Sequence, residues 1–227
     1  MVKSRLSLYA VRVFIILGIP MSLGCDFSRP ALWDGGIGDG PIQTGTTDLF
    51  TPEGDGSERI YRFKTNDRSA SRPRGKSYWF PLSGEGQTPF SAWEVTVNKI
   101  NGRRLAGFGI IMCHQTDSGG VESMLTVMIR VSGEYQIAEV VGADYQEFAP
   151  WQSFRYIRKG YGLSNTMRIV RVNDQFVLSI NGEEVERFHD NNDAPTHTGG
   201  IQGFLVVISP LEAFPSRPVE VTFKVEG

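Results

Sequence analysis

The feature that most constrains the fold of this 227-residue chain is an alternation of apolar and polar residues that recurs after residue 58. In the stretch 219–225, Val, Val, Phe and Val alternate with Glu, Thr and Lys. The stretches 93–98 and 125–131 show the same period of two. Such a period places one side of a β-strand on a core and the other side toward solvent. Because no long helical period follows residue 58, the sequence predicts an all-β domain.

Short turn motifs separate the alternating stretches. Asn181-Gly182 lies between 176–180 and 183–188, and this pair tolerates the positive φ angles of a type I′ hairpin turn. Similar turn-forming pairs separate other predicted strands: Asn173-Asp174, Ser132-Gly133 and Asn101-Gly102. Many short antiparallel strands joined by such turns are typical of a sandwich or a barrel.

Three turn-centred segments resemble the concanavalin A-like superfamily. They read GLSNTMRI at 162–169, NDQFVLSINGEEV at 173–185 and GGIQGF at 199–204. Their order is similar to laminin-G-like modules and to related sandwich domains of bacterial sugar-processing proteins. The resemblance implies a jelly-roll sandwich of two curved antiparallel sheets. Because these motifs mark turns, they say almost nothing about catalysis.

The first 24 residues have the three parts of a signal peptide. Lys3, Arg5 and Arg12 supply positive charge, and the apolar run 13–23 follows them. A bilayer-spanning helix needs about 20 apolar residues, so this shorter run favours a cleaved signal over a permanent anchor.

The end of that segment, SLGC at 22–25, resembles the lipobox of bacterial lipoproteins. Leu23 stands two places before the cysteine and Met21 four places before it, a relaxed form like that of spirochaetes. The resemblance implies cleavage between Gly24 and Cys25, acylation of Cys25 with palmitate, and attachment to an envelope membrane on its periplasmic or surface face. The alternative is an ordinary secretory signal in which Cys25 is only a thiol.

The second cysteine, Cys113, lies in the apolar stretch 108–113. A buried, inert thiol is therefore expected there. A Cys25–Cys113 disulfide is the alternative, and it requires an oxidising compartment.

Composition divides the mature chain into a linker and one domain. Residues 25–57 are rich in Gly, Pro, Thr and Asp, which is typical of a flexible tether, although Leu32-Trp33 and Leu49-Phe50 could dock on the domain. Residues 58–227 form the predicted β-sandwich. The signal peptide contains three of the 23 Lys and Arg and none of the 25 Asp and Glu, so the mature net side-chain charge is −5. The absence of a basic tail or stripe makes nucleic acid an unexpected partner.

No catalytic motif emerges from the sequence, and we predict no catalytic residue. Catalytic members of the superfamily place carboxylates on alternate residues of one strand, as glycosidic cleavage requires two carboxyl groups. Glu184 and Glu186 have that spacing, but a solvated strand edge is the better interpretation. Asp190 could orient the imidazole of His189 as a general base, but the sequence offers no nucleophile for it to activate.

A polar loop offers a candidate calcium site. Asp190, Asn192 and Asp193 supply the carboxylate and amide oxygens that this hard cation takes. Related lectin and laminin-G-like domains often carry a loop-borne ion. The alternative is a plain connection rich in turn formers.

The most aromatic segment, 145–161, offers the candidate ligand-binding residues Trp151, Tyr145 and Tyr156. Such rings stack on sugars or anchor protein contacts, or else fill a core. The sequence thus predicts a lipid-anchored envelope protein that recognises a glycan or a protein without catalysis. The alternatives are a concanavalin A-like glycoside hydrolase and a structural subunit of an envelope complex.

Overall fold

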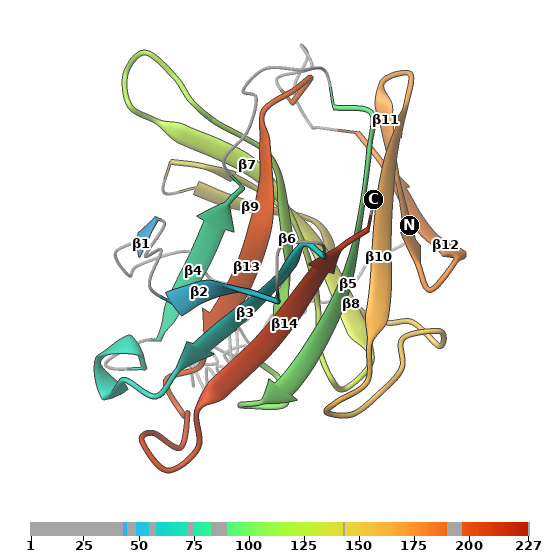
Figure 1. The fold of residues 1–227 in the computed structure, drawn as a ribbon. Helices are drawn as coiled ribbons and strands as arrows, with labels where there is room; N and C mark the ends of the chain where they lie inside the picture. The colour runs from blue at the N-terminus through green and yellow to red at the C-terminus, as the bar shows by residue number, and fades with distance from the viewer. Residues whose placement is uncertain are drawn as a thin grey trace, which may run out of the picture.

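The computed structural model describes residues 43–44, 49–54, 58–71, 75–82, 90–142, 144–189 and 197–226. Two seven-stranded sheets pack face to face as a sandwich (Figure 1). The first sheet, sheet A, has the order β1-β4-β13-β6-β7-β8-β9, and the second, sheet B, has the order β12-β11-β10-β5-β14-β3-β2. The strands of sheet A are β1 (Gln43–Thr44), β4 (Lys76–Pro81), β13 (Ile201–Ile208), β6 (Phe108–Thr116), β7 (Glu122–Ile129), β8 (Glu134–Val141) and β9 (Asp144–Ser153). Those of sheet B are β12 (Glu183–Phe188), β11 (Gln175–Ile180), β10 (Asn165–Val172), β5 (Ala92–Asn101), β14 (Val219–Val225), β3 (Ile60–Thr65) and β2 (Phe50–Glu53).

The predicted strands and turns are confirmed with small shifts at their ends. The 183–188 and 219–225 strands have the predicted bounds. Asn181 and Gly182 have φ angles of 55° and 86°, so this hairpin turn has the left-handed backbone that its sequence predicts. After the Asn101-Gly102 turn, the residues up to Gly107 form a loop, and strand β6 begins at Phe108. A 3₁₀ turn spans Arg68–Ala70, and no described helix has the length and hydropathy needed to cross a membrane.

The main core lies between the sheets. Strand β14 turns Val219, Val221 and Phe223 into it, and all three are fully buried. Phe223 stacks on Phe204 of the opposite sheet with ring centroids 4.5 Å apart. Alternate residues of β14 are partly exposed, as the period of two predicts.

Sheet A departs from that pattern, because its outer side is buried as well. Ile111, Met128 and Val140 point away from the main core and are at most 1% exposed. They form a second apolar cluster with Trp79 and with Leu205 of β13. The prediction that one side of the 125–131 strand faces solvent is therefore wrong for β7.

Part of the predicted linker belongs to the sandwich. Strand β2 pairs with β3, and the Phe50 ring lies 4.8 Å from Phe63 and 5.2 Å from Phe80 between ring centroids. The predicted docking of Leu49-Phe50 is thus confirmed, whereas Leu32-Trp33 lies outside the described residues. The signal peptide, Cys25 and most of the tether lie outside the described residues.

Cys113 is a buried thiol, as its apolar surroundings predict. Its Sγ donates to the backbone oxygen of His197 at 3.5 Å. The residue has a φ of 53° at an irregularity in the β6–β7 pairing. Such a bulge turns a strand locally, and here it brings the end of β6 close to Gly200.

Candidate functional site

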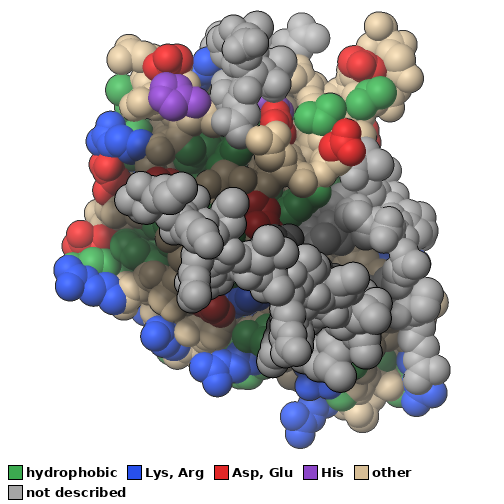
Figure 2. Space-filling view, turned by 180° about the vertical axis from the view of Figure 1, so that it is seen from behind, with side chains coloured by type: hydrophobic (Ala, Val, Ile, Leu, Met, Phe, Trp, Pro, Cys, Tyr) green, Lys and Arg blue, Asp and Glu red, His purple; other side chains and the backbone are tan. Residues whose placement is uncertain are grey.

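A strip of aromatic and polar side chains lies on the outer side of sheet A, at its β8–β9 margin. Tyr145 pairs opposite Val140 and Glu147 opposite Ala138, so both side chains share the outer face with the second apolar cluster. Glu147 is exposed and Tyr145 is half-buried. Figure 2 shows this side of the molecule, where hydrophobic and acidic side chains are visible in its recessed middle.

A chain of hydrogen bonds orders the polar groups of the strip. The Tyr145 hydroxyl donates to Oε1 of Gln136 at 2.8 Å, and Nε2 of Gln136 donates to Oε1 of Glu147 at 2.8 Å. Gln136 is fully buried. Since both ends of its amide are engaged, the phenol and the carboxylate are held at fixed positions on the two neighbouring strands.

Trp151 completes the strip at the far end of β9, where packing fixes its ring. The Arg130 guanidinium lies over the indole, with Cζ 3.6 Å from the ring centroid. On another side, a Cβ at Gly107 would come within 3.1 Å of Cη2 of Trp151. Trp151 is half-buried and packs on the second apolar cluster, outside the main core. Cation–π contact of this kind immobilises a ring that is partly open to solvent.

The structure separates Tyr156 from the other two predicted ligand-binding residues. Tyr156 lies in the loop after β9, where Arg155 donates to its hydroxyl at 2.7 Å and covers its ring. It is 37% exposed. The structure therefore brings Tyr145 and Trp151 together on one strand face and leaves Tyr156 at the end of the sandwich.

The carboxylates of this face are spread along the strands. Those of the described residues are Glu122, Glu134 and Glu147. The residue opposite Glu147 is Ala138, four positions from Glu134 on β8, which is about 13 Å along a strand. Glycosidases hold their two carboxyl groups about 5–9.5 Å apart, depending on stereochemical outcome. The strand positions of Glu134 and Glu147 are therefore farther apart than the two carboxyl groups of a glycosidase.

Glu184 and Glu186 do not form an alternate pair on one face. A register shift in the β11–β12 pairing sets Glu184 opposite Ser179 and Glu186 opposite Leu178, and these two neighbours project to opposite sides of β11. Glu184 forms a two-pronged ion pair with Arg187, both bonds at 2.7 Å. The solvated strand edge expected for Glu184 is thus what the structure shows.

Glu186 takes part in a different contact, at the margin between the sheets. It accepts a hydrogen bond from the Tyr135 hydroxyl at 3.1 Å. Burial, and then the neighbouring carboxylate, raise the pKa of Tyr135 above its ordinary value. Glu184 and Glu186 are therefore not presented as a catalytic pair.

Two polar residues of the strip carry no signal in the sequence. Gln136 and Arg130 belong to the strip, but only the strand register reveals it. Elsewhere, Glu139 lies 3.3 Å from Nδ1 of His197, and both side chains are buried inside the sandwich. The 57 positions between them hold no periodicity that would predict the contact.

The calcium prediction concerns residues that lie outside the described part of the chain, namely Asp190, Asn192 and Asp193. Within the described ranges, no group of three or more His, Cys, Asp or Glu side chains is arranged to hold a metal ion. His189 is exposed, and its Nε2 lies 2.9 Å from Nε2 of Gln175.

Solved structures similar to this chain share its fold. No protein-family model matches the chain, and no curated protein does. A mixed-linkage-glucan GH16 enzyme of Bacteroides ovatus, solved with its product, matches at TM-score 0.54 and 10% identity over 82% of this chain and 88% of its own. A β-1,3-1,4-glucanase (lichenase) from a mouse hindgut metagenome matches at TM-score 0.52 and 14% identity over 86% of this chain and 89% of its own. The β-glucanase of Bacillus licheniformis matches at TM-score 0.50 and 7% identity over 82% and 85%. The chain thus has the antiparallel jelly-roll sandwich of the concanavalin A-like fold.

Proposed function

We propose that this protein is a lipid-anchored envelope protein that recognises a glycan on the β8–β9 strip and does not hydrolyse it. The observation that carries the proposal is the strip itself. Two aromatic rings, Tyr145 and Trp151, share one sheet face with the exposed Glu147 carboxylate, which the buried Gln136 amide holds in place. Sugars are bound by aromatic rings beside a carboxylate, because a ring covers the apolar C–H face and the carboxylate accepts hydrogen bonds from the hydroxyls.

The spacing of carboxylates supports recognition over cleavage. Among the described residues of the outer face, Glu147 has no second carboxylate at the distance that general acid and base catalysis needs. A glycoside hydrolase is therefore the second candidate, favoured only by the fold shared with glucanases.

The fold neighbours suggest which glycans to try first. They include a GH16 enzyme of mixed-linkage glucan and a β-1,3-1,4-glucanase, and both names point to linear chains of glucose. A linear chain of this kind suits a strip that follows a strand edge, since one sugar can contact Tyr145 while another contacts Trp151.

The proposed location of the protein depends on lipid attachment. The segment 22–25 resembles a lipobox, and acylation of Cys25 would hold the sandwich at an envelope membrane. Metabolic labelling with a palmitate analogue tests this directly. The intact chain is expected to incorporate label, and the Cys25→Ala chain none. Label retained by the Cys25→Ala chain would contradict the assignment.

The function itself is tested with a glycan panel that reads binding and cleavage in the same samples. We expect at least one β-glucan to bind and no reducing ends to appear. A matched chain with Tyr145→Ala is expected to lose that binding. Release of reducing ends that disappears with Glu147→Gln would establish the hydrolase, and a blank panel beside a captured envelope protein would establish the protein-binding alternative.

A further inference from the structure

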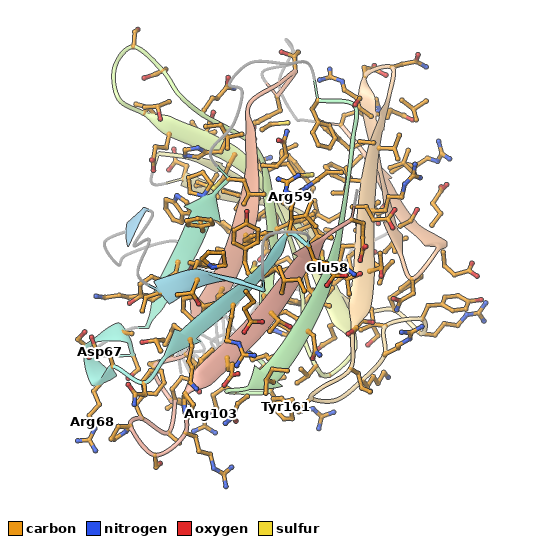
Figure 3. All side chains as sticks on the ribbon, viewed as in Figure 1. Glu58, Arg59, Asp67, Arg68, Arg103 and Tyr161 are labelled. Carbon is orange, nitrogen blue, oxygen red and sulfur yellow. The ribbon has the colours of Figure 1, made fainter. Side chains whose placement is uncertain are left out.

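The two ends of the sandwich differ sharply in charge. One end, which we name the basic end, consists of the described loops 66–71, 102–107, 130–133, 154–164, 181–182 and 209–218. It carries eight cations and two carboxylates: Arg68, Arg103, Arg104, Arg130, Arg155, Arg158, Lys159 and Arg217 against Asp67 and Glu212. Seven of these cations are available to a partner, because Arg130 is buried against Trp151. The described loops of the opposite end carry one cation and four carboxylates: Arg59 against Glu58, Asp117, Asp174 and Glu226. Figure 2 shows most Lys and Arg side chains along the lower edge of the molecule, and Figure 3 labels Arg68, Arg103 and Tyr161 there.

Large apolar side chains protrude from the same basic end. Leu211 is 66% exposed, Leu105 57%, Tyr161 46% and Leu163 45%. Aliphatic side chains at loop tips cost free energy in water unless something covers them. The described residues do not cover these four.

The loops that carry these tips are tied together. Tyr161 donates to the backbone oxygen of Gly102 at 2.5 Å, and Nε of Arg103 donates to that of Leu211 at 2.5 Å. Beneath them, Nζ of the buried Lys99 donates to two carbonyls of the 102–107 loop at 2.9 Å each. The protruding residues are thus held on one platform and pay little ordering entropy when they meet a surface.

We propose that the basic end docks on an anionic lipid bilayer. Its cations attract acidic headgroups, and the leucine tips enter the boundary between headgroups and acyl chains. A soluble polyanion would satisfy the arginines but would leave the exposed leucines in water. The proposal depends neither on acylation of Cys25 nor on glycan recognition, and docking in this way leaves the β8–β9 strip at the side of the sandwich.

The test places an environment-sensitive fluorophore at one end of the sandwich or the other, in two separate variants. Cys25→Ser removes one thiol and Cys113 is buried, so a new cysteine is the one that labels. Leu105→Cys places the fluorophore at the basic end, and Val121→Cys, 43% exposed, places it at the opposite end. Each fluorophore reports the polarity around its own position. A contact of another part of the chain with the membrane therefore leaves its signal unchanged.

With vesicles of phosphatidylcholine and about 30% phosphatidylglycerol, the fluorophore at 105 is expected to shift to the blue. It is also expected to be quenched by nitroxide-labelled lipid, while the fluorophore at 121 stays unchanged. Vesicles of phosphatidylcholine alone are expected to give little response at either site. The inference is overturned if both fluorophores behave alike, or if a soluble polyanion shifts the fluorophore at 105 and vesicles do not.

Charge variants provide an independent test of docking through the basic end. Arg104→Gln and Arg217→Gln alter exposed side chains, and each is expected to lower partitioning onto anionic vesicles about five-fold. Arg59→Gln, at the opposite end, is the matched control and is expected to change nothing. Equal effects from Arg59→Gln and Arg104→Gln would contradict docking through the basic end.

Discussion

The outer faces of the two sheets use their side chains in different ways. On sheet B, charged and hydroxylated residues satisfy one another across neighbouring strands. Arg62 donates to Glu220 at 2.7 Å, and the hydroxyls of Thr96 and Thr166 lie 2.8 Å apart. On sheet A, the outer face is an apolar cluster bordered by the β8–β9 strip.

That difference supports the binding role proposed for sheet A. A polar ladder on a solvated sheet needs no further partner, since its groups already hydrogen-bond across the strands. An aromatic and polar margin beside a buried apolar face suits the proposed glycan-binding surface.

The largest effect tests whether the outer face of sheet A is buried in solution. Ile110 and Ile111 are neighbours on β6, face opposite sides of sheet A and are both fully buried. Ile110→Ala and Ile111→Ala are each expected to lower the free energy of unfolding by about 2–5 kcal/mol. Chemical denaturation measures both. If Ile111→Ala costs well under 1 kcal/mol while Ile110→Ala costs several, the outer cluster is solvated and the contrast between the faces is lost.

The next effect concerns Lys99, a buried cation on the inner side of sheet B. Burial lowers its pKa from 10.5 to about 8. Its neutral amine still has two N–H groups, which suit the two carbonyls that it contacts. Between pH 8 and pH 10.5 the unfolded chain therefore binds more protons than the folded chain, so stability rises with pH in this window.

The expected rise is about 3 kcal/mol in total, by the ordinary conversion of a pKa shift. It is measured as the difference between the natural chain and the Lys99→Met chain in denaturation at pH 7.5, 9 and 10. A difference that stays flat across this range would show that Lys99 is hydrated.

The smallest effect tests the polar ladder of sheet B. Arg62 contacts Glu53 and Glu220, yet its side chain is 38% exposed. Surface ion pairs contribute about 0–1 kcal/mol, so Arg62→Met is expected to change stability by less than 1 kcal/mol and to leave glycan binding unchanged. Impaired glycan binding in this variant would move the binding surface to sheet B.

Sequence reasoning captured the fold because each hairpin carries its own local signal. Asn181-Gly182 determines its turn through backbone conformation alone, and the alternation in 219–225 identifies its inner face. It missed the burial of Met128, because a sheet's outer environment depends on which strands lie beside it.

The candidate site was predictable only in part. The aromatic content of 145–161 pointed to Tyr145 and Trp151, but also to Tyr156, which lies past the end of β9. Gln136 and Glu147 meet across two strands through a pairing with two register shifts, and no sequence period reports such shifts.

The most direct test of the account compares two tryptophans on opposite sides of the architecture. Trp151 belongs to the strip, whereas Trp93 stacks on Phe204 at the main core. Affinity for the best β-glucan of the panel is measured together with unfolding for Trp151→Ala and Trp93→Ala. The account predicts at least a tenfold loss of affinity, about 1.4 kcal/mol, with a stability loss of about 1–2 kcal/mol for Trp151→Ala. For Trp93→Ala it predicts unchanged affinity and a stability loss of about 3 kcal/mol. Unchanged affinity in the folded Trp151→Ala chain would contradict the central claim.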